Sequence, residues 1–171
     1  MAQTDLMTGI YNRGHGESLI EQSLHNKVKG MMCIIDCDKF KSINDTYGHK
    51  SGDIAIRSMA TILHECCTNG EICCRFGGDE FIVFAANYTQ QDAERITDNI
   101  QKKLEDYNRT TSMPFALHAS SGYHIAVPTP DKSLFAMVTL ADTIMYAEKR
   151  KKRHSKYLKS SSSIRQDAES N

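Results

Sequence analysis

Residues 72–84 read Ile-Cys-Cys-Arg-Phe-Gly-Gly-Asp-Glu-Phe-Ile-Val-Phe, with short apolar runs on both sides of a glycine pair. Two such runs around Gly-Gly are typical of a β-hairpin, because glycine adopts the positive φ angles of tight turns without steric cost. Two acids, Asp79 and Glu80, follow the turn directly. Adjacent carboxylates repel each other unless a cation lies between them. The stretch therefore predicts a hairpin whose tip either binds a divalent metal or is a solvated turn with two surface acids.

The composition indicates one soluble domain. The chain has 171 residues, of which 40% are hydrophobic and 25% are charged, values that are ordinary for a globular protein. Its apolar runs are far too short to cross a bilayer and its first residues resemble no signal peptide, so we predict a cytoplasmic protein without a membrane partner. The six cysteines lack the spacing of a zinc site, and we interpret them as small buried side chains.

Charge is distributed unevenly along the chain. Residues 149–159 carry seven Lys and Arg side chains and no acid, whereas residues 1–148 carry 13 basic and 19 acidic side chains. Such a basic run is usually a solvated helix end and less often a nucleic-acid patch. Only one aromatic residue, Tyr157, interrupts it, so we predict no nucleic-acid partner.

Apolar periodicity predicts alternating helices and strands. We expect a short helix through Leu19–Leu24, a buried strand at 31–35, a helix at 42–49, a helix at 53–67, the hairpin, a helix at 90–107, a strand at 115–123 and a helix at 134–150. This order predicts an α/β fold with an antiparallel hairpin. Residues 160–171 are rich in serine and poor in apolar residues, which predicts a disordered tail after a domain of residues 1–159.

Acidic residues follow the predicted buried strand and begin the predicted helix at residue 53. Asp36 closes the strand and is either a turn or capping residue or a metal ligand. Asp53 is an N-cap candidate. In an α/β layout, Asp36 can lie beside Asp79 and Glu80. Three hard oxygen donors suit Mg²⁺ better than zinc, and with phosphates as further ligands they form a nucleotide-processing site.

Five segments in the same order carry a family resemblance. They are Asp5-x-x-Thr8-Gly9-x-x-Asn12-Arg13, Asp36-x-Asp38-x-Phe40-Lys41-x-Ile43-Asn44-Asp45-x-Tyr47-Gly48-His49-x-x-Gly52-Asp53, Arg75-Phe76-Gly77-Gly78-Asp79-Glu80-Phe81, Ser120-Ser121-Gly122 and Ala141-Asp142-x-x-Met145-Tyr146-x-x-Lys149. Together they resemble a GGDEF domain, that is, a diguanylate cyclase. The resemblance implies a palm-like fold similar to nucleotidyl cyclases and polymerases, with a central, mostly antiparallel sheet wrapped by helices.

The resemblance also implies an activity. Two GTP molecules, each held by one protomer of a homodimer, would condense to cyclic di-GMP with release of pyrophosphate. Asp36, Asp79 and Glu80, with the Cys37 carbonyl, would hold Mg²⁺ or Mn²⁺. Asp79 and Glu80 would be the catalytic residues, and Asp79 or a neighbouring carboxylate would help to deprotonate the attacking 3′-hydroxyl. A metal that bridges phosphates neutralises developing charge and orients an in-line attack.

Substrate-binding residues follow from the same resemblance. Asn44 and Asp53 match guanine-reading positions, because a carboxylate accepts from the N1–H and the amino group that guanine presents. Lys41, Lys149 and Arg153 match phosphate contacts, and Phe40, Gly77 and Gly78 match further positions at the substrate. The chain departs from the usual pattern at Lys152-Arg153-His154, where the family usually has Gly-Arg-Asn.

Two other functions remain open from the sequence. One is a catalytically silent GGDEF module that senses GTP or cyclic di-GMP, and the other is an adenylyl-cyclase-like or polymerase-like palm domain. Thr68 also replaces the arginine of an Arg-x-x-Asp segment through which many family members bind their product, so we expect no product inhibition. Because the opening motif starts almost at residue 1, we expect an upstream sensory domain in the full-length protein.

Overall fold

The computed structural model describes the backbone of residues 2–126 and 133–168 and the side chains of residues 2–126 and 133–152. Its elements follow the predicted order. They are α1 (Arg13–His25), β1 (Gly30–Cys37), α2 (Phe40–Tyr47), α3 (His49–Cys66), β2 (Ile72–Arg75), β3 (Glu80–Ala86), α4 (Gln90–Thr110), β4 (Ala119–Ala126) and α5 (Leu134–Ala168).

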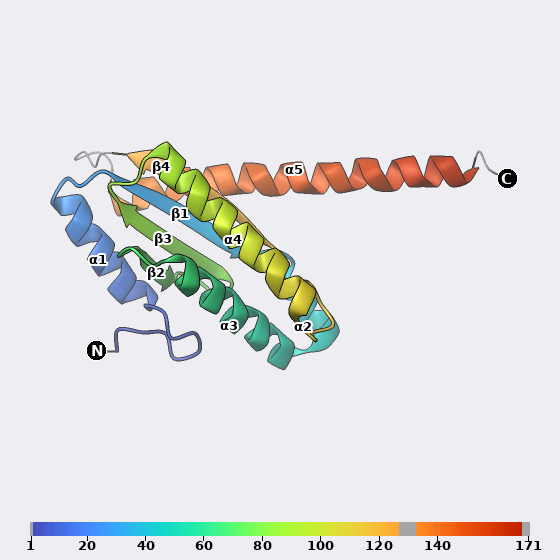
Figure 1. Cartoon of the computed structure of the whole chain (residues 1–171), viewed down its shortest axis with the longest axis horizontal. Coiled ribbons are helices and arrows are strands. Elements are labelled where there is room, and N and C mark those ends of the chain that lie inside the picture. Colours follow the sequence, from blue (N-terminus) through green and yellow to red (C-terminus); the bar gives the residue numbers. More distant parts are fainter. Residues whose placement is uncertain (1, 127–132, 169–171) are drawn as a thin grey trace.

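The four strands form one antiparallel sheet in the order β2-β3-β1-β4. The strand predicted from the apolar run is therefore central, with β3 on one side and β4 on the other (Figure 1). This arrangement confirms the predicted α/β fold with a central antiparallel sheet wrapped by helices.

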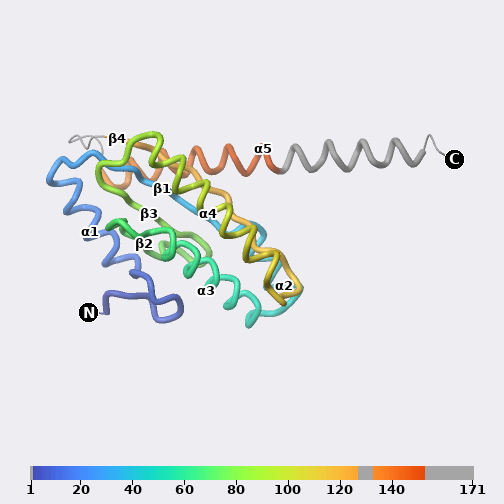
Figure 2. The backbone as a smooth tube through the Cα atoms, viewed as in Figure 1, coloured from blue at the N-terminus to red at the C-terminus, as the bar shows by residue number. Residues whose placement is uncertain are grey.

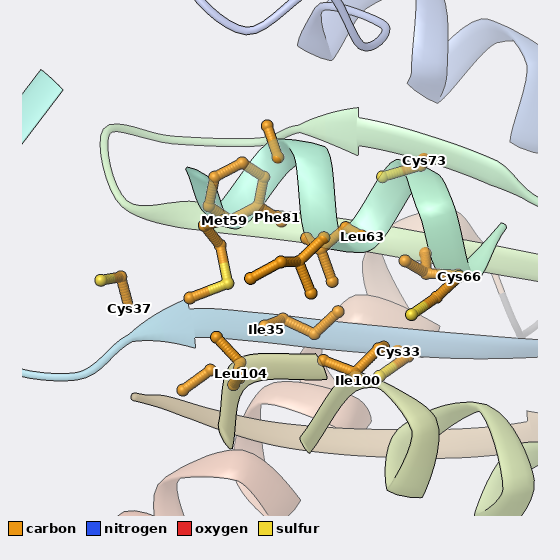
Figure 3. Packing of buried hydrophobic residues seen from close by; sticks show 14 of the residues in the cluster. Cys33, Ile35, Cys37, Met59, Leu63, Cys66, Cys73, Phe81, Ile100 and Leu104 are labelled. Atoms are coloured by element: carbon orange, nitrogen blue, oxygen red, sulfur yellow. The ribbon is translucent and has the colours of Figure 1, made fainter. Parts of the chain in front are cut away.

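Side chains of β1 alternate between two apolar layers, as a strand requires. Met31, Cys33 and Ile35 pack with α3 and α4, whereas Met32 and Ile34 pack with α1 and α5. Figure 3 shows the first layer, in which Met59 and Leu63 of α3 and Ile100 and Leu104 of α4 surround Ile35. The alternation directs Asp36, one residue after Ile35, toward the layer of α5.

Close packing fixes α5 against β4. A Cβ atom added at Gly122 would lie 2.4 Å from the Ala141 carbonyl oxygen and 2.3 Å from the Met145 nitrogen. Real Cβ atoms do not approach other atoms so closely, so only glycine allows the helix to lie this near to the strand. The backbone trace in Figure 2 follows the same path of α5 along β4.

The hairpin was predicted correctly, but the reason given for its glycines is wrong. Positive φ angles occur at Gly9, Gly48 and Gly70 and not at Gly77 or Gly78. A Cβ at Gly77 would lie 2.9 Å from the Glu80 Oε2 atom, but that atom ends a flexible side chain that can shift, so space alone does not require glycine there. Nothing lies within 4 Å of a Cβ built on Gly78, so that glycine leaves open space at the exposed tip.

Some predicted element bounds are wrong. The strand predicted at 115–123 is β4 at Ala119–Ala126, and α5 continues past Arg150 as far as Ala168. Neither glycine nor proline, the two residues that most disfavour a helix, occurs after residue 130. Neither residue type therefore stops α5. The division into a domain of 1–159 and a disordered tail stays a prediction. Among the described residues, none of the helices has a stretch long and apolar enough to cross a membrane.

Candidate functional site

The site is centred on two carboxylate residues that lie side by side on neighbouring strands and on the same face of the sheet. Asp36 near the end of β1 pairs with Glu80 at the start of β3 in the antiparallel register. Strand alternation directs both side chains toward α5, since Ile35 and Phe81 beside them belong to the opposite layer. The predicted proximity of the strand end and the hairpin tip is therefore present for these two acids.

Lys149 of α5 completes this centre. Its Nζ atom lies 2.6 Å from the Asp36 Oδ1 atom, and the side chains of Lys149 and Asp36 are only 20% and 13% exposed. The resemblance gives Lys149 a phosphate contact, whereas in the structure it forms an ion pair with a proposed metal ligand.

Burial raises the pKa of Asp36 above its ordinary value, although the hydrogen bond and charge of Lys149 oppose the shift. Burial likewise raises the pKa of Glu80, and the negative charges of Asp36, Asp79 and Asp142 add to the effect. Both shifts have the same physical meaning, because a half-buried site with several acids favours neutral carboxyl groups unless a cation is present. The centre is therefore an electrostatically unfavourable arrangement that a bound cation would stabilise.

Hydrogen bonds hold the hairpin tip in place. Arg75 donates from Nε to the Gly77 carbonyl oxygen at 3.2 Å and from Nη2 to the Gly78 carbonyl oxygen at 2.9 Å. Its Nη1 atom lies 3.2 Å from the Asp5 Oδ1 atom, so the opening segment of the chain is tied to the tip. Asp79 follows, and its carbonyl oxygen accepts from the Cys37 amide at 3.0 Å. Asp79 is thus attached through its backbone to the end of β1.

The connection from β1 to α2 turns sharply beside the carboxylates. Lys39 has a left-handed backbone, with φ 59° and ψ 26°, at the N-cap of α2, a conformation that is uncommon for residues other than glycine. No side chain caps this helix start. Free amide groups at a helix N-terminus favour anions. Phe40 is half-buried and Lys41 is exposed at this N-terminus, so both predicted substrate contacts lie where an anion would be favoured.

The two predicted guanine-reading residues belong to the packed pair α2 and α3. The Asn44 Oδ1 atom of α2 lies so near to Gly52 of α3 that a Cβ on Gly52 would be 2.0 Å away. Asp53 is the residue after Gly52. The alternative role of Asp53 as an N-cap is wrong, because α3 begins at His49 with Gly48 as its cap. Asp53 lies one turn inside the helix and is half-buried, so helix capping does not explain it.

The donor chemistry fits a hard divalent cation only in part. Asp36 and Glu80 supply facing carboxylates, and carboxylate oxygens are the ligands that Mg²⁺ prefers. Across the described residues, however, no three side chains of His, Cys, Asp or Glu are gathered closely enough to hold a metal. The residues therefore fit a metal that takes its remaining ligands from main-chain carbonyls, water and substrate phosphates, as Mg²⁺ usually does.

Sequence reasoning missed a second group of polar contacts beside the centre. Lys152 donates to the Ala119 carbonyl oxygen at 2.8 Å and lies 3.0 Å from Glu148 Oε1 and 3.7 Å from Asp38 Oδ2. Ser120 Oγ donates to Asp38 Oδ1 at 2.7 Å. These contacts join α5 to the ends of β4 and β1. The motif contains Asp38 and Ser120, but only the packing of α5 reveals that Lys152 reaches them. The side chain of Arg153, a predicted phosphate contact, lies outside the described residues.

Comparison with known proteins places these features in a family. The family described as "Diguanylate cyclase, GGDEF domain" matches residues 2–155. A curated relative from Escherichia coli K12, named "Probable diguanylate cyclase DgcJ", is 33% identical over 141 residues, which are 77% of this chain and 28% of the relative. Another from the same organism, "Cyclic di-GMP phosphodiesterase PdeR", is 30% identical over 151 residues, 87% of this chain and 23% of the relative.

The chain thus spans about a quarter of the length of these two curated relatives. Among solved structures, the GGDEF domain of DgcB from Caulobacter crescentus, in complex with c-di-GMP, superposes with a TM-score of 0.77. Its sequence is 25% identical, and the match covers 88% of this chain and 91% of that one. The motifs, the sheet order and the match over nearly the whole chain agree, and this chain belongs to the GGDEF, or diguanylate cyclase, family.

Proposed function

We propose that this chain is an active diguanylate cyclase, which condenses two GTP molecules into cyclic di-GMP with release of pyrophosphate. The observation that carries the proposal is the pairing of Asp36 with Glu80, with Lys149 against Asp36. A half-buried pair of acids with raised pKa values and a single lysine beside it lowers the stability of the fold. The same arrangement is suited to binding a metal–phosphate complex.

Each part of the substrate has a candidate partner in the chain. The carboxylates of Asp36 and Glu80, with the Cys37 carbonyl, would hold Mg²⁺ or Mn²⁺, and phosphate oxygens and water would complete its ligands. The metal would supply charge neutralisation at the α-phosphate. Lys149 would bind phosphate oxygens when GTP is present, together with Lys41, Arg153 and the uncapped start of α2 beside Phe40.

Guanine would lie against Asn44 and Asp53, which supply an amide and a carboxylate side by side on α2 and α3. The carboxylate would accept from the N1–H and amino donors of guanine, which adenine does not present in the same pattern. Gly77 and Gly78 would leave room above the hairpin tip for the sugar and phosphates. Of these two glycines, Gly78 is the one whose added Cβ would have nothing within 4 Å. Asp79 or Glu80 would take the proton of the attacking 3′-hydroxyl.

One bound GTP is half of the reaction, because the product contains two guanylates. A second protomer would present the other GTP, so the active species would be a homodimer, formed or aligned by a segment outside this chain. The chain would act in the cytoplasm, where GTP is available.

Incubation with GTP and Mg²⁺ followed by separation of the nucleotides tests this function. We expect cyclic di-GMP and pyrophosphate, no corresponding product from ATP, and no turnover after chelation of the metal. Tight GTP binding without turnover at any protein concentration would instead identify a silent sensor module. A product from ATP would refute the assignment of guanine readers.

A further inference from the structure

The contact between Lys149 and Asp36 has a consequence for metal binding. The Lys149 ammonium lies 2.6 Å from an oxygen of Asp36, which is the carboxylate that the proposed metal would need. Both side chains are mostly buried, so water screens their attraction much less than it screens a surface pair. An ammonium at this distance already offsets part of the negative charge of the carboxylate.

The fold fixes the backbone of Lys149 beside Asp36. The backbone of α5 is fixed where Gly122 meets Ala141 and Met145. One turn further along the helix, Lys152 donates to the Ala119 carbonyl oxygen. Between these two anchors the helix cannot slide along β4. Only the four-carbon stem of Lys149 remains free to swing, and this flexibility is characteristic of lysine.

We propose that Lys149 is the resident counter-cation of Asp36 in the nucleotide-free protein, and that it competes with the divalent metal for this carboxylate. The ammonium contacts one oxygen of Asp36, and a divalent cation on either oxygen of the same carboxylate would lie within a few ångströms of it and be repelled. The metal therefore binds weakly by itself. It binds well only with a nucleoside triphosphate, whose phosphate oxygens accept the displaced ammonium. The inference rests on the proposed function for its second half, since that half requires the triphosphate.

On this proposal Lys149 weakens metal binding when no nucleotide is present and strengthens binding of the nucleotide. These opposite effects distinguish it from a residue that only contacts phosphate. A residue that only binds phosphate has no effect on metal affinity when no nucleotide is present. A competing ammonium lowers that affinity, so its removal must raise it. The neighbouring Lys152 offers a matched control, because it lies on the same helix, pairs with Glu148 and Asp38, and does not contact Asp36.

The test measures Mn²⁺ binding without nucleotide, from the electron paramagnetic resonance signal of the free ion. The proteins compared are the unaltered chain and the variants Lys149→Met, Lys149→Arg and Lys152→Met, each checked for folding by circular dichroism. We expect Lys149→Met to bind Mn²⁺ about tenfold more tightly, which corresponds to about 1.4 kcal/mol. Lys149→Arg, which keeps the charge, should stay near the unaltered chain, and Lys152→Met should change by about twofold or less.

Three results would overturn the proposal. These are an unchanged or weaker Mn²⁺ affinity in Lys149→Met, an equal gain in Lys152→Met, and no Mn²⁺ binding by Lys149→Met. A second measurement uses the α,β-methylene analogue of GTP in the presence of Mn²⁺, and Lys149→Met should bind it about tenfold more weakly. If no protein binds the analogue, the proposed function fails, while the nucleotide-free Mn²⁺ measurement still decides whether Lys149 competes for Asp36.

Discussion

Replacement of Glu80 by glutamine should raise the stability of the metal-free protein while it abolishes activity. Burial, followed by the charges of Asp36, Asp79 and Asp142, raises the pKa of Glu80 above its ordinary value of 4.5. The folded protein thus holds this proton to a higher pH than the unfolded chain does. Ionisation therefore lowers the free energy of unfolding as the pH rises above about 4.5, and the penalty persists at pH 7.

Glu80→Gln removes this penalty and leaves the shape of the side chain nearly unchanged. No described residue donates a hydrogen bond to the Glu80 carboxylate, so the variant loses little in exchange. Because one pKa unit corresponds to about 1.36 kcal/mol and the group is partly solvated, we expect a gain of about 1 kcal/mol or less. For a domain of this size that gain raises Tm by about 2–4 °C.

The assay is urea or thermal unfolding in a chelator at pH 7 and at pH 4. The gain should be present at pH 7 and shrink at pH 4, below the ordinary pKa of 4.5, where Glu80 is mostly neutral in the folded and the unfolded chain. Glu105→Gln, on the exposed face of α4, is the matched control and should change stability by less than about 0.5 kcal/mol. A Glu80→Gln protein that is less stable at pH 7, or equally stabilised at pH 4, would refute the electrostatic account. Cyclic di-GMP synthesis by the variant should fall by about two to three orders of magnitude, and near-normal turnover would exclude Glu80 as a metal ligand.

Two further predictions concern nucleotide recognition. Asp53→Ser should lower the preference for GTP over ATP by about 1–3 kcal/mol, because guanine donors in the site lose their acceptor; unchanged kcat/KM ratios for the two nucleotides would remove Asp53 from the guanine site. Micromolar cyclic di-GMP should not inhibit initial rates, since Thr68 lacks a guanidinium and the Glu71 carboxylate already accepts hydrogen bonds from the Tyr88 hydroxyl and, at 2.7 Å, from the Asn69 amide. Strong inhibition after preincubation with the product would contradict this prediction.

The sequence predicted the order of the elements and the antiparallel hairpin because both depend on local pattern. Apolar runs, their period and the glycine pair indicate which segments are strands and which are helices. The position of Asp36 at the end of a buried strand also predicted its proximity to the hairpin acids. The register then confirmed that proximity for Glu80.

Features that depend on the packing of distant segments were not predictable. Asp53 resembled an N-cap because its residue type favours that position, but the preceding helix turn begins at His49. Gly77 resembled a turn residue with positive φ, whereas its φ angle in the folded hairpin is not positive. The ion pair of Lys149 with Asp36 joins residues more than a hundred positions apart, and only the close approach of α5 to β4 at Gly122 produces it.

The most direct test of the proposed activity is the initial rate of cyclic di-GMP formation from GTP and Mg²⁺, measured over a hundredfold range of protein concentration. Each protomer would contribute one GTP, so the rate per protein molecule should rise with concentration as protomers meet. The product should be cyclic di-GMP, and it should be absent with Glu80→Gln. Absence of cyclic di-GMP from the unaltered chain at every concentration would contradict the account. A rate per protein molecule that stays constant on dilution would contradict its requirement for two protomers.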